Sequence, residues 1–192
     1  MTNQELLAEF QELGVLQSGH FKLTSGLHSE QYMQCAKLFE YPRKAAEVVK
    51  TLIPKLPEGI DTVIAPAIGG VTVGYELARL LGCRFIFAER QDGNMTFRRG
   101  FKLRPGEKVL AVEDVVTTGG SVREVVDLAK ECGADVLGIA TIVDRSQGTA
   151  VFGVPFYSLV SVEITAYKPE KCPLCREGVA LQTPGSRKTS RG

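Results

Sequence analysis

Short apolar runs alternate along the chain with longer segments in which apolar residues recur every three or four positions. The runs have the length and composition of buried strands, and the longer segments have the period of helices. This order is typical of a parallel sheet covered by helices on both faces, so we predict an α/β fold. Strands are predicted near 62–65, 83–88, 108–112 and 136–143, with helices near 3–13, 42–53, 70–81 and 119–132.

The N-terminal part of the chain adds a hairpin to this pattern. Residues 20–34 contain a turn at Ser25 and Gly26 between two extended pieces. No linker or internal repeat interrupts the chain, and its 192 residues suit one domain with a sizeable core. We predict a single domain over residues 1–182 and a disordered polar tail over residues 183–192.

The composition disfavours several classes of function. Lysine and arginine number 23 against 22 aspartates and glutamates, and the resulting net charge of +1 predicts no nucleic-acid and no membrane partner. No apolar run approaches the roughly 20 residues of a membrane-spanning helix, and the polar start MTNQELLAEF is unlike a secretory signal. Five cysteines, an odd number, favour reduced thiols and a cytoplasmic protein.

The segment VLAVEDVVTTGGSV, residues 109–122, carries the most specific chemistry in the sequence. A buried strand leads into two acids, and two threonines, two glycines and a serine then lead into a helix. Small residues at a helix N-terminus leave backbone N–H groups free to bind a phosphate. The acids suit ribose hydroxyls or a hydrated Mg²⁺ ion on the same ligand. The alternative is a simple turn in which Ser121 caps the helix.

The same segment resembles the phosphoribosyl diphosphate (PRPP) signature of the type I phosphoribosyltransferase family. The stretches 19–34, 64–71 and 142–148 resemble its orotate phosphoribosyltransferase members. The resemblance implies an open parallel sheet flanked by helices, with a small hood formed by residues 14–35 and about 150–180. It also implies Mg²⁺-dependent transfer of phosphoribose from PRPP to orotate, which yields orotidine 5′-monophosphate and diphosphate.

The resemblance assigns the PRPP site to two loops and one arginine. Glu113 and Asp114 would hold the ribose hydroxyls, stabilise positive charge on the ring and serve as candidate Mg²⁺ ligands. Arg90 and Arg99 are the other catalytic candidates. The predicted PRPP set is Ala67, Ile68, Gly69, Gly70, Arg90, Glu113, Asp114, Val115, Val116, Thr117, Thr118, Gly119, Gly120 and Ser121.

The same resemblance assigns orotate to a second set of residues. The planar fork of Arg145 suits the carboxylate of orotate, and the alternative is an ion pair with Asp144. For Tyr32 and Met33 the alternative role is ordinary packing within the hood. Many family members carry lysine at the position of Thr24, and Lys22 lies on the same strand face. The predicted orotate set is Lys22, Tyr32, Met33, Thr117 and Arg145.

Residues 89–107 are polar and rich in glycine and arginine, which predicts a mobile lid over the diphosphate. The resemblance implies that this lid reaches across a homodimer interface into the partner's site. The alternative is a solvated basic hairpin. Many members carry a Lys-x-His element here and a lysine at the position of Gly69, and this chain has neither. The resemblance therefore leaves the diphosphate clamp and any general acid unassigned.

Two other functions fit parts of the pattern. A purine-type phosphoribosyltransferase would share the PRPP segment, but purines have no carboxylate to meet Arg145. A PRPP-sensing regulator that binds nucleic acid would need a basic face, which the near-neutral charge disfavours.

Cys172 and Cys175, in the sequence CPLCREG, resemble half of a zinc knuckle. Zinc takes four ligands, and the sequence has no second CxxC. Cys35, His20 or the other subunit of a dimer are candidates to complete the set. The expectation from sequence is a reduced turn without metal.

Overall fold

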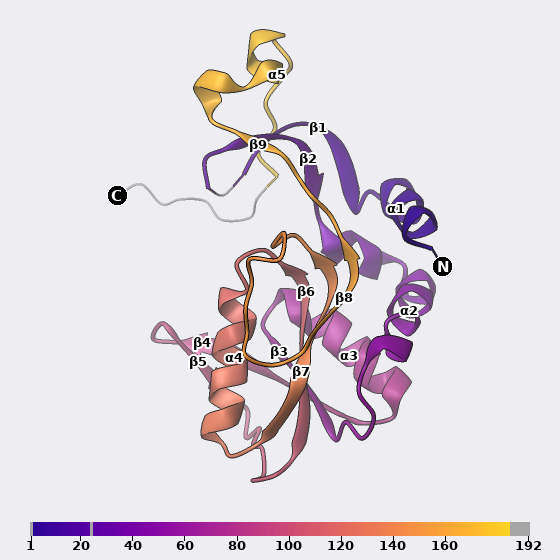
Figure 1. Cartoon of the computed structure of the whole chain (residues 1–192), viewed down its shortest axis with the longest axis vertical. Helices are drawn as coiled ribbons and strands as arrows, with labels where there is room; N and C mark the ends of the chain where they lie inside the picture. The colour runs from indigo at the N-terminus through magenta and orange to yellow at the C-terminus, as the bar shows by residue number, and fades with distance from the viewer. Residues whose placement is uncertain (1, 24, 185–192) are drawn as a thin grey trace.

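The computed structural model describes residues 2–23 and 25–184. Thr24 lies outside the described part, and so do residues 185–192 of the tail that was predicted to be disordered. Figure 1 shows a large body built around a central sheet and a small hood at one end of the body. The hood contains chain segments from both the N-terminal and the C-terminal parts of the sequence.

Six strands form the central sheet in the order β5–β4–β3–β6–β7–β8. They are β3 (Thr62–Pro66), β4 (Arg84–Gln91), β5 (Asn94–Phe97), β6 (Lys108–Val116), β7 (Asp135–Asp144) and β8 (Phe156–Ser161). Neighbouring strands are parallel except β5, which returns antiparallel along β4. The predicted fold class, an open and mostly parallel sheet flanked by helices, is confirmed.

Helices cover both faces of the sheet (Figure 1). They are α2 (Pro42–Lys50) and α3 (Gly69–Leu81) on one face and α4 (Gly120–Glu131) on the other, whereas α1 (Asn3–Glu12) packs beside β1 and α5 (Pro173–Arg176) lies in the hood. Side chains alternate between the two faces along a strand. Leu110 and Val112 therefore join the core that contains α2 and α3, whereas Val109 and Ala111 join the core under α4. Within the described residues, no helix combines the length and apolarity needed to cross a bilayer.

The hood is a three-stranded antiparallel sheet in the order β1–β2–β9. Its strands are β1 (Leu16–Lys22), β2 (His28–Met33) and β9 (Ala166–Tyr167). The predicted hairpin is confirmed, and it begins at Leu16 rather than at residue 20. A bulge between Ser18 and Phe21 shifts the register, so that the consecutive side chains of His20 and Phe21 are both buried. Gln182 pairs with Phe21 and closes the hood from the C-terminal side.

Two strand boundaries differ from the sequence-based expectation. β6 continues to Val116, so the two acids lie within the strand rather than after it. β8 joins the central sheet, so the C-terminal half of the hood begins after Ser161 instead of near residue 150. For β6, polar residues at the end of the strand interrupt the apolar pattern that marks a strand in the sequence. For β8, the position at the edge of the sheet weakens the same pattern.

The segment predicted as a mobile lid, residues 89–107, is paired in its first part, whereas residues 98–107 form no strand or helix. β4 and β5 form a hairpin whose turn contains Asp92 and Gly93, both with positive φ. Met95 and Leu103 are buried and attach the segment to the core under α4. The alternative of a basic hairpin describes this conformation, and lid motion stays a prediction.

Candidate active site

The acid- and glycine-rich segment lies at the carboxyl end of β6, in the middle of the sheet. Open parallel sheets bind ligands at this edge. A cavity of about 440 Å³ opens there, beside the N-terminus of α4. It is lined by Arg90, Glu113, Val115, Thr117, Thr118, Gly119, Gly120, Ser121, Val122 and Glu124. Eight of these ten residues belong to the predicted PRPP set, which the fold therefore brings together.

The loop before α4 has the features of an anion site. Gly119 precedes the first residue of the helix with a φ of 73°, in the left-handed region that favours glycine. A Cβ at this position would lie 2.4 Å from the ring of Phe152. Gly119 rather than Ser121 is the N-cap, and no side chain caps the helix. The first N–H groups and the positive end of the helix dipole are thus left for a ligand at the cavity.

Glu113 and Asp114 lie together at the end of β6 but have different neighbours. Glu113 lines the cavity, whereas a Cβ on Gly69 would lie 2.7 Å from Oδ1 of Asp114. The two carboxyl groups also interact with each other, both through charge and through a hydrogen bond between the side chains. Oδ1 of Asp114 also accepts a hydrogen bond of 2.9 Å from the N–H of Val115. One acid therefore serves the phosphate loop, and the other lies against the turn that begins α3.

Both carboxyl groups have raised pKa values. Burial raises the pKa of Glu113 to about 9, and the negative charge of Asp114 acts in the same direction. Burial also raises the pKa of Asp114, against the effect of the Val115 N–H. Within the described residues neither carboxyl group takes part in a salt bridge. The pair therefore retains a proton near neutral pH and offers oxygen ligands to hydroxyls or to a cation.

The turn between β3 and α3 lies beside Asp114. A Cβ on Gly70 would lie 2.8 Å from the carbonyl oxygen of Val112, so α3 can start this close to the sheet only with glycine there. The Ala67–Ile68 peptide bond is cis, and the Ile68 side chain is 85% exposed. The turn has no basic side chain, and backbone N–H groups at the start of α3 are its ligand donors. Diphosphate binding at Ala67–Gly70 stays a prediction.

Arg145 follows β7 and supplies a half-buried cation. Its backbone N–H donates a hydrogen bond of 2.8 Å to the carbonyl of Val116. Its Nε is buried without a hydrogen-bond partner in the described structure. The alternative ion pair is not formed, because Asp144 accepts a hydrogen bond of 2.7 Å from the N–H of Ser146 instead. Burial lowers the pKa of Arg145, while the nearby Cys35 and Tyr32 act in the opposite direction. A half-buried guanidinium whose Nε has no hydrogen-bond partner in the described structure favours an anionic ligand.

The other predicted orotate residues divide into two groups. Tyr32 lies near Arg145, since burial raises the pKa of Tyr32 and the charge of Arg145 opposes this shift. Met33 is 6% exposed and packs in the apolar core, so the packing alternative holds for it and the expected base contact is not supported. Lys22 is exposed at the end of β1, and its contact with a base stays a prediction. Thr117 is exposed at the cavity.

The two predicted catalytic arginines have different positions. Arg90 lies at the cavity, where its guanidinium donates to Glu124 at 2.7 and 2.8 Å. Arg99 instead donates to Glu89 at 2.8 and 3.0 Å, and it is absent from the residues that line the cavity. The structure therefore brings Arg90 to the site and does not bring Arg99 there.

Sequence reasoning missed three residues at or beside the site, Val122, Glu124 and Phe152. Glu124 lies four positions after Gly120 on α4, so the helical period was a usable signal that it faces the loop. Phe152 packs against Gly119 from a segment far along the chain, and nothing local in the sequence indicates this contact.

A family model for the phosphoribosyl transferase domain matches residues 36–173. The chain belongs to the phosphoribosyl transferase family. This phosphoribosyltransferase is 52% identical over 189 residues to an orotate phosphoribosyltransferase of Caldanaerobacter subterraneus subsp. tengcongensis, a match that covers 98% of this chain and 100% of the relative. It is 50% identical over 193 residues to an orotate phosphoribosyltransferase of Chlorobaculum parvum, with 100% of both chains covered. The resemblance inferred from the sequence motifs is confirmed.

Solved structures agree with the observed fold of the phosphoribosyltransferase. The crystal structure of orotate phosphoribosyltransferase from Aeropyrum pernix superposes with a TM-score of 0.71 at 22% identity. The match covers 82% of this chain and 93% of that chain. At this identity the likeness supports the architecture, and the choice of substrate rests on the residues of the site.

Proposed function

We propose that this phosphoribosyltransferase moves the phosphoribosyl group of PRPP onto orotate, giving orotidine 5′-monophosphate and diphosphate for pyrimidine biosynthesis. The observation that carries the choice of base is Arg145, whose Nε is buried without a partner in the described structure. Orotate has a carboxylate that a guanidinium fork can bind with two hydrogen bonds, and a purine has none. The full-length relatives, which are named orotate phosphoribosyltransferases, support the same choice.

In this proposal each part of PRPP has its own group of residues. The 5-phosphate binds the N–H groups and hydroxyls of the loop Thr117–Ser121 at the start of α4. The ribose hydroxyls donate to Glu113 and Asp114, and the diphosphate lies against the turn Ala67–Gly70. Orotate then lies toward Arg145 and Tyr32, on the side of the site that the hood covers.

The chemistry requires positioning and charge stabilisation rather than a covalent enzyme intermediate. A bond forms from a ring nitrogen of orotate to the anomeric carbon of ribose, and the proton of that nitrogen passes to solvent. The bond from that carbon to diphosphate breaks, and diphosphate leaves with the electron pair. Positive charge builds on the ribose ring, and the negative charge of the Glu113–Asp114 pair stabilises it. Arg90 is close enough to the cavity to exchange Glu124 for a ligand anion.

We propose Mg²⁺ as the cofactor of this reaction. The donor set fits, since Glu113 and Asp114 are half-buried oxygen ligands at the cavity edge, and burial raises the pKa values of both. When bound with PRPP, Mg²⁺ would reduce the negative charge on the departing diphosphate. The protein residues hold the donor, orient the ribose and exclude water.

A base-competition assay tests the proposed substrate. Orotate, uracil, adenine and hypoxanthine are each supplied with PRPP and Mg²⁺, and diphosphate release is measured. We expect turnover with orotate at least about 100-fold faster than with the other bases, because only orotate can engage the Arg145 guanidinium. Uracil is the matched control, since it differs from orotate by the carboxylate. Turnover of adenine or hypoxanthine at a rate similar to that of orotate would contradict the proposal.

We also propose that the protein is a homodimer, with the partner copy seated on the α2–α3 side. An apolar hollow of about 470 Å³ lies there, and large exposed apolar surfaces mark protein interfaces. Its rim includes Phe85 and Phe87 of β4, the strand that leads into the β4–β5 hairpin, so a partner in the hollow would lie beside this hairpin. The hollow is lined by Phe39, Pro42, Ala45, Val71, Thr72, Tyr75, Glu76, Phe85 and Phe87.

Sedimentation equilibrium checks the dimer. The wild-type chain of 20.9 kDa is expected to sediment with twice that mass. Tyr75, which is 61% exposed, lies at the hollow, so Tyr75→Asp should shift the protein toward the monomer by at least about 10-fold in dissociation constant. Val151→Asp is the control, because Val151 is 74% exposed but does not line the hollow. A wild-type monomer at high protein concentration would rule the dimer out.

A further inference from the structure

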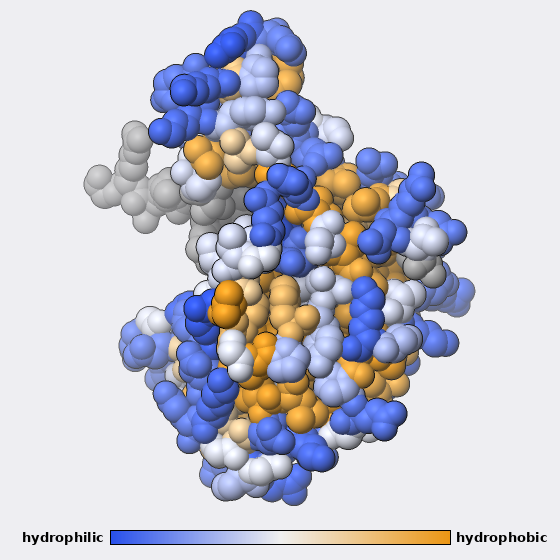
Figure 2. Space-filling view, viewed as in Figure 1, coloured by the Kyte–Doolittle hydropathy of each residue, from blue (hydrophilic) through white to orange (hydrophobic). Residues whose placement is uncertain are grey.

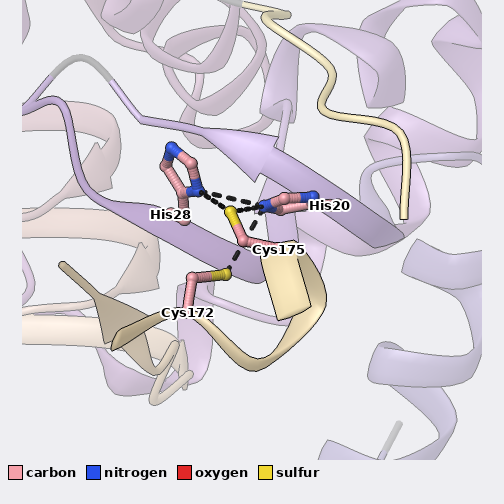
Figure 3. A group of neighbouring side chains, drawn as sticks. All are labelled: His20, His28, Cys172 and Cys175. Atoms are coloured by element: carbon pink, nitrogen blue, oxygen red, sulfur yellow. Dashed lines mark hydrogen bonds between the residues drawn. The ribbon is translucent and has the colours of Figure 1, made fainter. Parts of the chain in front are cut away.

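Four side chains of metal-binding type meet in the hood. His20 lies in β1, His28 begins β2, and Cys172 and Cys175 lie at the start and within the single turn of α5. One nitrogen or sulfur atom from each of them lies within 4.8 Å of the others. Figure 3 shows the four side chains pointing toward one another from the hairpin and from the C-terminal segment.

Two of the distances within this cluster fall in the range of a tetrahedral metal site, and two are slightly shorter. Nε2 of His20 lies 3.5 Å from Sγ of Cys172 and 3.7 Å from Sγ of Cys175. Nδ1 of His28 lies 3.0 Å from Nε2 of His20 and 3.2 Å from Sγ of Cys175. Zinc bonds of about 2.3 Å to sulfur and about 2.0–2.1 Å to nitrogen place tetrahedral ligand atoms about 3.3–3.8 Å apart. The cluster therefore has the size of a zinc coordination sphere.

Hydrogen bonding alone does not account for these contacts. Three atoms surround Nε2 of His20, but a ring nitrogen has a single site, either one proton or one lone pair. Nδ1 of His20 lies 2.8 Å from the carbonyl oxygen of Val179. Because a carbonyl oxygen only accepts, Nδ1 carries the proton and Nε2 directs its lone pair into the cluster. A metal-ligating histidine needs this tautomer, and a backbone carbonyl is its usual second partner.

The segment that carries the cysteines has little else to hold its shape. From Lys168 to Pro184, Cys172 is the only buried residue, and α5 has four residues. Figure 2 shows mostly hydrophilic residues over the hood tip. Backbone pairing fixes the segment near its two ends, through β9 on β2 and through Gln182 on β1. Units without an apolar core are commonly stabilised by a bound metal.

We propose that His20, His28, Cys172 and Cys175 bind a structural Zn²⁺ ion that ties the C-terminal segment to the hairpin. Two thiolates and two imidazoles are a common structural zinc set, and softer ligands of this kind do not favour Mg²⁺. Four protein ligands leave no open position for a substrate, so the ion has no part in the transfer reaction. This proposal differs from the turn without metal that the sequence led us to expect. The reason is that the fold brings His20 to Cys172, although 152 residues separate them in the sequence.

Metal content tests the site directly. The full-length chain, without a polyhistidine tag, is purified without chelators and analysed for metals by mass spectrometry. We expect about one zinc ion per chain in the wild type and less than about a fifth of that in Cys175→Ser. Cys132→Ser, a cysteine outside the cluster, is the matched control and should keep its zinc. Co²⁺ added to the metal-free wild type should give thiolate-to-cobalt charge-transfer bands, which Cys175→Ser lacks.

Limited proteolysis gives a second readout that does not depend on a variant. Removing zinc from the wild type with a chelator should expose the segment 168–184 to cleavage while the body stays intact, and added Zn²⁺ should restore protection. Two results would overturn the site. One is a wild type that holds no zinc and gives no cobalt bands after metal is supplied, and the other is full zinc retention in Cys175→Ser.

Discussion

Replacing Arg145 by alanine is expected to raise the KM for orotate by about 100-fold or more and to change the KM for PRPP by less than about threefold. The side chain is half-buried, its Nε is buried without a partner in the described structure, and the neighbouring Asp144 accepts a hydrogen bond from the N–H of Ser146. The carboxylate of bound orotate would supply the missing partner. Removing the guanidinium should therefore weaken the binding of orotate rather than that of PRPP. Steady-state kinetics with each substrate varied at saturation of the other measures the split.

Two further variants separate this role from a general structural effect. Arg145→Lys keeps the charge but not the planar fork, so it should recover less than about a tenth of the lost efficiency. Arg79→Ala removes an exposed arginine paired with Glu76 on α3 and should leave both KM values near the wild type. If Arg145→Ala raised both KM values equally, the assignment of Arg145 to orotate would be wrong.

Glu113→Gln is expected to make the ligand-free protein more stable at alkaline pH and nearly inactive. Burial raises the pKa of Glu113 from its ordinary value of 4.5 to about 9 in the folded protein. Between these values the folded state binds the proton and the unfolded state does not, so stability falls as the pH rises. Glutamine cannot ionise and avoids this loss. The free energy of unfolding should exceed that of the wild type by about 2 kcal/mol or more at pH 8, and by less than about 1 kcal/mol at pH 5.

The same variant should lower kcat/KM for PRPP by about 100-fold or more, because Mg²⁺ and PRPP would displace the proton that Glu113 holds in the ligand-free protein, and a glutamine cannot supply the resulting negative charge to the ribose ring. Urea denaturation at the two pH values and initial rates with PRPP varied are the two measurements. Glu131→Gln, an exposed glutamate near the end of α4, should change neither quantity. A pH-independent effect on stability would show that Glu113 is ionised in the folded protein at neutral pH.

The body of the fold was predictable because both faces of its sheet are buried. Apolar residues fill consecutive positions in β3, β6 and β7, and the following helices carry a clear period with glycines at their ends. The pattern fails where a strand is half exposed. Phe156–Ser161 at the sheet edge and Asn94–Phe97 in the hairpin are such strands, and neither was predicted.

The candidate site was predictable where its residues are neighbours in the sequence. Glu113–Ser121 form one strand–loop–helix unit, so local spacing was enough to indicate a phosphate site. Contacts between distant segments were not accessible in this way. Burial of Met33, the pairing of Arg99 with Glu89 and the approach of His20 to Cys172 all depend on tertiary packing.

The three-stranded hood has a consequence for how the protein is made. β2 ends at Met33 and its partner β9 begins at Ala166, so about 130 residues separate the two edges. During synthesis on the ribosome the hairpin emerges early. The edge of β2 then stays unpaired until the whole parallel sheet has been synthesised. The donor-binding half can therefore be complete before the half that receives the base. A nascent chain released before Ala166 would contain its phosphate loop but would lack β9, the third strand of the hood.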